Sequence, residues 1–201
     1  MDDRHIKTAV KARFRELAFR TGIRAITIDM IARDCGISKK TLYLFFRSKD
    51  DLVEAILEDM LAEYNSGVKT IDASVKDPLD KLYRLIELPF ALFGEISTQL
   101  VKDVTLLYPH IEKRLDTLRN THRKTVMNNY VDGVRAGYFK DINPTFVESF
   151  LSGAGRQVMS SAFVLENNMT LRQIFTYFRD IMLSGLLKKN GPAAKKKKGR
   201  K

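Results

Sequence analysis

Hydrophobic residues recur along this chain at steps of three and four, the spacing of helices that bury one face. The first such segment runs from Arg4 to Arg20, and its apolar positions are Ile6, Ala9, Val10, Phe14, Leu17 and Ala18. Gly22 follows and is suited to end the helix. Because the alternation typical of strands is weak throughout, the pattern predicts an all-α protein.

Two short helices and a longer one are expected next. Thr27 is suited to cap the first short helix, and Gly36 marks a tight turn before Ser38 begins the second. A longer helix is expected near Ser48, whose hydroxyl can cap it. Its buried stripe would consist of Leu52, Ala55, Ile56, Met60 and Leu61.

Prolines and capping residues predict four more helices. They run from Asp77-Pro78 towards Gly94 with a bend at Pro89, from Pro109 to near Gly137, from Asn143-Pro144 to about Leu165, and from Thr170 to about Leu187. We expect about nine helices in all, followed by Gly191-Pro192 and a lysine-rich tail that has nothing to bury.

The formal net charge is +11, and the excess lies at the two ends of the chain. Residues 1–52 hold 12 Lys and Arg against 7 Asp and Glu, residues 53–194 hold 17 against 17, and residues 195–201 hold 6 against none. A basic N-terminal segment before a neutral middle favours a polyanionic partner, with nucleic acid the first candidate. The basic tail could add nonspecific attraction to DNA or only aid solubility.

The sequence disfavours export, a membrane span and a metal centre. Its start, Met1-Asp2-Asp3-Arg4-His5, is acidic where a signal peptide needs a basic region, and no run of eighteen apolar residues follows. We therefore expect a cytoplasmic protein with no membrane partner. The one cysteine, Cys35, cannot form an internal disulfide and has no neighbouring zinc ligands, so we expect a small buried side chain and no metal.

An enzyme is an alternative class that the motifs disfavour. The chain has no GxSxG nucleophile turn and no loop that would cradle a phosphate, and Gly153-Ala154-Gly155 lacks the third glycine of a dinucleotide site. We expect neither catalysis nor a cofactor.

The segment from Thr27 to Phe46 has the spacing of a helix-turn-helix, with the turn at Cys35-Gly36-Ile37. In the second helix one face carries Leu42, Phe45 and Phe46, and the opposite face carries Lys39, Lys40, Tyr43 and Leu44. We expect the first set to be core. The second set could neutralise phosphates and reach base edges in a DNA groove.

Several residues here resemble the tetracycline-repressor (TetR) family of transcriptional regulators: Ile31-Ala32, the run from Cys35 to Tyr43, Phe46 and Ser48-Lys49. The resemblance covers roughly residues 4–52. It implies phosphate contacts for Thr27, Tyr43 and Lys49, although capping alone also explains Thr27 and Ser38. The full expected DNA-binding set is Thr27, Ser38, Lys39, Lys40, Thr41, Tyr43, Leu44 and Lys49.

Two positions depart from the family. Lys40 stands where glycine is common, and Leu44 stands where histidine or another polar or aromatic residue is common. The resemblance therefore does not supply the operator sequence. Lys40 could contact guanine or phosphate, and Leu44 could pack against a thymine methyl group.

The resemblance also implies a ligand-binding and dimerisation domain over residues 53–190, after a DNA-binding domain over 1–52 and before a basic tail over 191–201. Broad apolar faces on the last two long helices would pair with a second subunit. The expected interface residues are Phe150, Val158, Phe175, Phe178 and Met182. The expected pocket residues are Phe90, Phe93, Leu107, Tyr108 and Tyr130, for which ordinary core packing is the alternative.

These observations predict a homodimeric transcriptional regulator, a repressor that a partly apolar small-molecule effector releases from a palindromic double-stranded DNA operator. The alternative is a nonspecific or architectural DNA-binding protein, which the basic tail favours and the large charge-neutral domain disfavours. Salt dependence separates the two, because only a specific regulator keeps its preference for one sequence at physiological salt.

Overall fold

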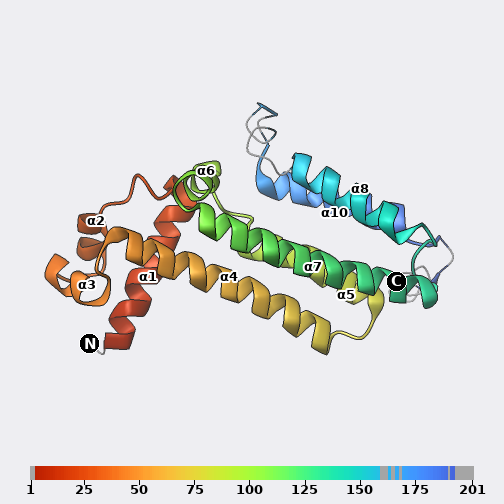
Figure 1. Ribbon diagram of the computed structural model, residues 1–201, viewed down its shortest axis with the longest axis horizontal. Coiled ribbons are helices and arrows are strands. Elements are labelled where there is room, and N and C mark those ends of the chain that lie inside the picture. The colour runs from red at the N-terminus through yellow and green to blue at the C-terminus, as the bar shows by residue number, and fades with distance from the viewer. Residues whose placement is uncertain (1–2, 159–162, 164–165, 168, 190, 193–201) are drawn as a thin grey trace, which may run out of the picture. The chain divides into compact units, whose positions relative to one another are not determined.

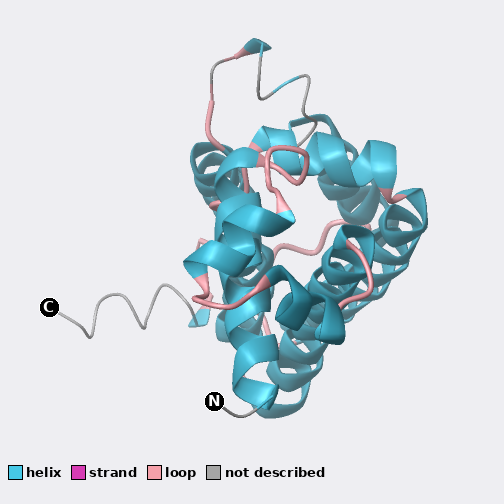
Figure 2. Ribbon diagram, turned by 90° about the vertical axis from the view of Figure 1, so that its left-hand side faces the viewer, coloured by secondary structure: helices cyan, strands magenta, loops and turns pink. Residues whose placement is uncertain are grey.

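The computed structural model of this 201-residue chain describes residues 3–158, 163, 166–167, 169–189 and 191–192. Within these residues the regular secondary structure is helical, apart from one isolated antiparallel bridge between Phe139 and Leu187 (Figures 1 and 2). The predicted all-α class is confirmed. The expected end of one helix at Leu165 and most of the basic tail lie outside the described residues.

The helices are α1 Asp3–Thr21, α2 Ile28–Asp34, α3 Lys39–Phe45, α4 Lys49–Ser74, α5 Pro78–Phe93, α6 Thr98–Leu107, α7 Pro109–Arg135, α8 Pro144–Val158 and α10 Leu171–Leu186 (Figure 1). In the part of the chain that the structure describes, these nine helices match the expected number. In that same part, no helix is both long enough and apolar enough to cross a membrane.

Side-chain caps explain why these helices begin where they do. The Thr27 hydroxyl accepts a hydrogen bond from the backbone N–H of Met30 at 3.2 Å, and the Ser38 hydroxyl accepts one from Thr41 at 3.0 Å. Asp77 caps α5 in the same way, with Pro78 at the first helical position. Each cap satisfies a donor that the helix leaves unpaired, and each start was predicted from the sequence.

Helix α6 is the element that the sequence patterns did not predict. Between Gly94 and Pro109 no proline or glycine marks a helix start, but Ser97 provides a cap, with its hydroxyl accepting from the N–H of Leu100 at 3.2 Å. The helix is ten residues long and ends beside Tyr108 and Pro109. A single serine cap indicates a helix start less clearly than Pro78 and Pro109, which begin the neighbouring helices α5 and α7.

The chain packs as two compact units. The first comprises Met1–Glu63 with Glu95–Leu115, and the second comprises Tyr64–Gly94 with Asp116–Lys201. Helices α4 and α7 each contribute to both units. The units therefore do not divide the chain at one position, and α6 packs with the N-terminal helices although it follows them by some fifty residues.

The first unit has a closed apolar core. Its buried residues come from α1, α2, α3, the first half of α4, and α6, with Leu42 on α3 and Leu52 on α4 fully enclosed. The predicted stripe of α4 is largely confirmed, since Leu52, Ile56, Met60 and Leu61 are buried and Ala55 is half-buried. This core holds α3 rigidly by one face.

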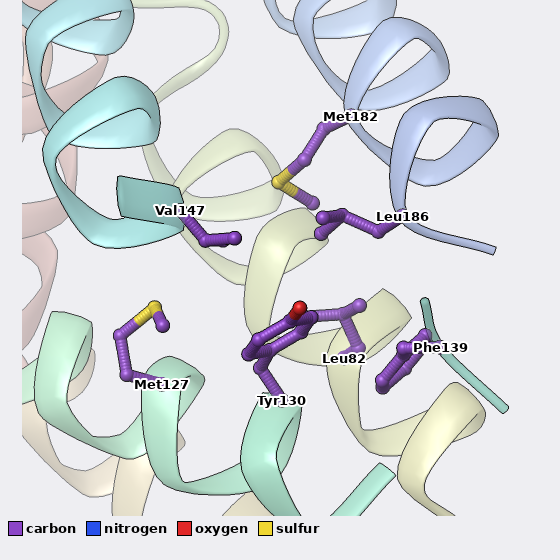
Figure 3. Packing of buried hydrophobic residues seen from close by; sticks show 7 residues of the cluster. All are labelled: Leu82, Met127, Tyr130, Phe139, Val147, Met182 and Leu186. Atoms are coloured by element: carbon purple, nitrogen blue, oxygen red, sulfur yellow. The ribbon is translucent and has the colours of Figure 1, made fainter. Parts of the chain in front are cut away.

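The second unit has two adjoining apolar clusters. The larger one is formed by residues of α5, α7, α8, α10 and the segment after α7, namely Leu82, Met127, Tyr130, Phe139, Val147, Met182 and Leu186 (Figure 3). Tyr130 keeps its hydroxyl satisfied by donating to the backbone carbonyl of Lys140 at 2.7 Å. The burial of a tyrosine with a partnered hydroxyl is what stable cores require.

The smaller cluster contains a buried polar pair. Tyr64, Val68 and Leu85 form its centre, and the Tyr64 hydroxyl is hydrogen-bonded to Nδ1 of His122. Burial lowers the pKa of His122 to about 4, although the backbone carbonyl of Leu85 opposes part of this effect. Burial also raises the pKa of Tyr64, so both side chains are neutral at pH 7.

The lowered pKa of His122 predicts a pH dependence of stability. Between pH 6.5 and pH 4 the unfolded chain binds a proton at this residue that the folded chain excludes, so folding stability falls as pH falls through this window. A shift from 6.5 to about 4 corresponds to at most about 3 kcal/mol. Denaturant unfolding at pH 7 and pH 4 should show a smaller loss for His122→Phe than for the wild type.

The exposed His110 provides the control for this measurement. The variant His110→Phe should keep the wild-type loss of stability, because the side chain of His110 is more than half exposed and lies 3.3 Å from the exposed Glu54 carboxylate. Equal pH dependence in the wild type and in His122→Phe would contradict the burial of a neutral imidazole.

Candidate nucleic-acid interface

Helix α3 presents one polar face to solvent. Leu42 and Phe46 are buried, whereas Lys39 and Lys40 are exposed, Tyr43 is 47% exposed and Leu44 is 76% exposed. Phe45 is only half-buried, and Lys7 of α1 lies over its ring. The predicted division into a core face and an outward face is therefore confirmed for all but Phe45, which lies at the border between them.

The turn between α2 and α3 is fixed by backbone geometry. Gly36 has a φ of +64°, a conformation that side-chain-bearing residues rarely adopt, and the N–H of Ile37 donates to the carbonyl of Ala32 at 2.9 Å. Cys35 beside it is half-buried, and burial raises the pKa of its thiol. It is less buried than expected, but its environment is that of a packed neutral side chain.

Two of the three lysines at this surface have particular surroundings. Lys39 forms an ion pair with Asp29 of α2 at 2.5 Å, and both side chains are more than half exposed. Lys49 begins α4, and burial lowers its pKa while the nearby carboxylates of Asp50 and Asp103 oppose this effect. Lys40 is exposed on the outward face of α3.

The residue that follows Lys49 is held by α4 and α6 together. The Tyr108 hydroxyl donates to the Asp50 carboxylate at 2.7 Å, and burial together with this bond raises the pKa of Tyr108. Glu54 and Glu58 follow Asp50 by one and two turns of α4. Nε2 of His110 lies 3.3 Å from the Glu54 carboxylate, and Arg114 forms an ion pair with Glu58. These contacts fasten the first half of α4 to the segment at the start of α7.

The helix-turn-helix is anchored by the fully buried carboxylate of Asp103 on α6. Its Oδ2 accepts hydrogen bonds from the backbone N–H groups of Ile23 and Arg24, at 2.7 and 3.1 Å, and its Oδ1 accepts from Gln99 at 2.8 Å. The Arg24 guanidinium adds an ion pair at 3.5 Å. Asp103 thus fixes the loop that leads from α1 into α2.

Gly22 allows this close approach. Its φ of +80° is in the left-handed region, and a Cβ placed there would lie 2.7 Å from Oδ2 of Asp103 and 2.6 Å from Cγ of Gln99. A second backbone bond runs alongside, from the N–H of Ser97 to the carbonyl of Phe19 at 2.7 Å. The role of Gly22 therefore goes beyond the helix stop expected from the sequence.

The eight expected DNA-binding residues lie in the first unit. Thr27 and Ser38 cap α2 and α3, Thr41 bonds to the Ser38 hydroxyl, and the rest lie on α3 or at the start of α4. All are exposed or half-buried, and DNA contact by each of them stays a prediction. Among the described residues, no group of three or more His, Cys, Asp and Glu side chains is arranged to hold a metal ion.

The five expected pocket residues occupy different environments. Tyr108 and Leu107 belong to the first unit, where Tyr108 is bonded to Asp50 and Leu107 is 45% exposed. In the second unit, Tyr130 is core, Phe93 packs edge-on against Tyr64 at 5.7 Å, and Phe90 packs against Phe175 at 5.6 Å. Of these, Phe93 alone adjoins the buried Tyr64–His122 pair directly.

The five expected interface residues also differ in exposure. Phe150 is exposed and Val158 and Phe175 are half-buried, but Met182 is buried in the larger cluster of its own chain and Phe178 packs against that cluster. The prominent exposed apolar side chains of α8 and α10 are Phe146, Phe150, Tyr177 and Ile181. Because α10 carries apolar residues on both faces, the sequence pattern does not distinguish its buried apolar residues from its exposed ones.

Comparison with known proteins adds sequence and fold relationships. Residues 15–56 match the family described as bacterial regulatory proteins, tetR family. The chain is 24% identical over 164 residues to the HTH-type transcriptional regulator YvaF of Bacillus subtilis, covering 81% of this chain and 86% of the relative. It is 29% identical over 140 residues to the HTH-type transcriptional repressor KstR2 of Mycolicibacterium smegmatis, covering 65% and 66%.

A solved structure extends the likeness to nearly the whole fold. A transcriptional regulator from Saccharomonospora viridis, solved in complex with choline, superposes with a TM-score of 0.66. The match covers 92% of this chain and 97% of that protein, at 20% sequence identity. Because the identity is low, this likeness concerns the fold alone.

The hydrogen bonds of Asp103 predict that this residue contributes substantially to the free energy of unfolding. In Asp103→Ala the N–H groups of Ile23 and Arg24 lose their acceptor, which should destabilise the chain by about 2–4 kcal/mol in denaturant unfolding. Asp59→Ala is the matched control, since its carboxylate makes an exposed bridge to Lys11 that should contribute less than about 1 kcal/mol. Similar losses in both variants would refute the anchoring role.

Proposed function

Because this chain belongs to the TetR family of bacterial regulatory proteins, we propose that it is a homodimeric repressor that binds a palindromic operator and is released by a small-molecule effector. Proteins of this family are transcription regulators and not enzymes. The observation that carries the proposal is the exposed face of α3, with Lys39, Lys40, Tyr43 and Leu44 on a helix whose other face is locked into a core.

The chemistry of this face suits the major groove. Lys40 is free to approach a phosphate or a guanine edge, the Tyr43 hydroxyl can donate to a phosphate, and Leu44 offers an apolar contact for a thymine methyl group. Lys39 must first leave Asp29, which reduces its net gain from a phosphate. A regulator of this kind must reach the genomic DNA that carries its operator, so we expect the protein to act in the cytoplasm.

Dimerisation would cover the exposed apolar side chains of α8 and α10. These two helices lie side by side in the second unit (Figure 1), and they expose Phe146, Phe150, Tyr177 and Ile181. A second copy offers the same residues in return, which gives a two-fold interface of four helices. Two recognition helices related by this axis would enter successive major grooves about 34 Å apart.

Effector control would act on the spacing of the two recognition helices. An effector releases DNA only if it prefers the conformation in which that spacing is mismatched, and DNA then weakens effector binding by the same factor. We assign effector binding and dimerisation to residues 53–190 and DNA binding to residues 1–52. The choline-bound regulator from Saccharomonospora viridis supports a small-molecule site in this fold.

A nonspecific architectural DNA-binding protein is the second candidate, since residues 195–201 hold six Lys and Arg and no acidic residue. Such a protein would bind all DNA sequences through their phosphates, and its affinity for all of them would fall together as the salt concentration rises. The precise capping and anchoring of α2 and α3 support the specific regulator instead.

Selection from a random double-stranded DNA library at physiological salt tests DNA recognition. The wild type should retain a palindrome. Lys40→Ala should weaken binding to this palindrome and reduce the slope of log affinity against log salt concentration by about one per half-site. Tyr43→Ala should also weaken binding to it. Lys69→Ala, at an exposed lysine of α4, is the matched control and should bind normally. Retention of DNA without sequence preference would favour the architectural protein.

Light scattering and sedimentation of the full chain test the dimer. Ile181→Lys places a charge in the proposed interface and should produce a monomer with much weaker operator binding, because two half-sites no longer bind together. Leu106→Lys is matched in exposure, 67% against 66%, but lies on α6 and should remain dimeric. A monomeric wild type, or a dimeric Ile181→Lys, would rule out this interface.

A further inference from the structure

Phe45 of α3 is half-buried, although its place in the helical pattern predicts a core residue. The ammonium group of Lys7 on α1 lies over its ring, 5.7 Å from the ring centre, which is within the range of a cation–π contact. The side chain of Lys7 is exposed. The contact therefore holds an exposed positive charge beside the helix that carries most of the proposed DNA-binding residues.

The two edges of α3 border different helices. Along one edge, Lys39 pairs with Asp29 of α2. Along the other edge, Thr41 and Phe45 lie one turn apart and are both half-buried, and Lys7 of α1 lies against this edge (Figure 1). The exposed outward face of α3 lies between the two edges.

The edges of a recognition helix face the DNA backbone, because the helix fills the major groove. A helix with its side chains is about 10–12 Å across and the groove is about 12 Å wide, so each edge of the helix lies against one sugar–phosphate backbone. Base edges form the floor of the groove, and the phosphates line its rim. A cation at the edge of α3, such as Lys7, is therefore closer to phosphates than to bases.

The charge of Lys7 is available to a phosphate. Among the described residues, no carboxylate lies within ion-pair distance of its ammonium group, whereas Lys11, one turn later on α1, bonds to Asp59 at 2.8 Å. A ring face attracts a cation without neutralising it, and an ammonium group has three donors. Lys7 can thus keep its contact with Phe45 while it donates to a phosphate oxygen, and a side chain held in advance loses less entropy on binding.

We infer that Lys7 binds a backbone phosphate of the operator, on the strand that borders the Thr41–Phe45 edge of α3, and that Phe45 positions its ammonium group. This inference rests on the proposed function. It adds to that function a DNA contact from α1, outside the helix-turn-helix, and a role for a half-buried aromatic residue of α3.

Selection and titration with Lys7→Ala test the contact. Because a phosphate contact adds affinity without reading sequence, the variant should select the same palindrome as the wild type and bind it about tenfold more weakly, since a dimer loses two contacts. The slope of log affinity against log salt concentration should fall by about one per half-site. Arg20→Ala is the matched control: it removes an exposed cation of α1 about 20 Å further along the helix and should bind normally.

Uncharged phosphates locate the contact on the DNA. The probes are operator duplexes in which one phosphate per half-site is replaced by a methylphosphonate, at positions that cover both strands and the flanks of the palindrome. At one position the replacement should weaken the wild type about tenfold and leave the affinity of Lys7→Ala unchanged, because the charge that is removed has no partner in that variant. At the other positions the two losses should add.

Phe45→Leu separates positioning from packing. Leucine is apolar but offers no aromatic face, so Phe45→Leu should weaken operator binding in the wild type by less than Lys7→Ala does and should have no further effect in the Lys7→Ala background. A purely structural role of Phe45 would weaken binding equally in both backgrounds. The methylphosphonate measurements need no change at Phe45 and stay decisive if Phe45→Leu fails to fold.

The outcomes separate this inference from the proposed function. Wild-type affinity of Lys7→Ala for a selected operator, a changed palindrome, or the lack of any phosphate at which the two losses coincide would overturn the inference and leave the proposed function intact. Equal weakening by Phe45→Leu in both backgrounds would overturn the positioning role. Failure to select any operator would refute the proposed function and the inference with it, because no particular phosphate then lies beside Lys7.

Discussion

The buried carboxylate of Asp103 is the interaction on which the DNA-binding unit depends. It holds two consecutive backbone N–H groups, those of Ile23 and Arg24, and so sets the direction in which the chain leaves α1 and enters α2. The caps at Thr27 and Ser38 then fix where α2 and α3 begin, and Leu42 fixes which face of α3 is outside. A shift at Asp103 would therefore reach Lys40 and Tyr43 through rigid, short connections.

Local signals in the sequence predicted much of this arrangement. Serine, threonine and aspartate before apolar periods located the starts of α2, α3, α4 and α5, because a cap acts within one turn of its own residue. The phase of α3 followed from three-and-four spacing. Local signals did not predict helix α6 or the partners of Asp103. The carboxylate and the loop that it binds are 80 residues apart, and no pattern within a helix links them. The same limit applies to α10, where only packing distinguishes buried Met182 from exposed Ile181.

Two buried polar side chains, Asp103 and His122, show how such groups are accommodated in apolar surroundings. Asp103 has every oxygen engaged, so its burial fixes one arrangement of the chain and offers nothing to a ligand. His122 on α7 has Nδ1 bonded to Tyr64, and the backbone carbonyl of Leu85, which Pro89 leaves without a helical donor, also acts on its ring. In both places a backbone group that regular structure leaves unpaired lies next to a buried side chain of complementary polarity, as the burial of polar groups requires.

The ion pair between Asp29 and Lys39 has a consequence for how a regulator finds its site. If Lys39 binds phosphate as proposed, the carboxylate of Asp29 beside it weakens its attraction to any DNA backbone, and Lys39 contributes fully only where the fit of α3 to the groove draws it away from Asp29. The residence time on unrelated sequences is then shorter, and a smaller fraction of the protein is bound to them. Among the millions of competing sites in a genome, a few copies of the protein would then occupy the operator sooner, at the expense of some affinity for it.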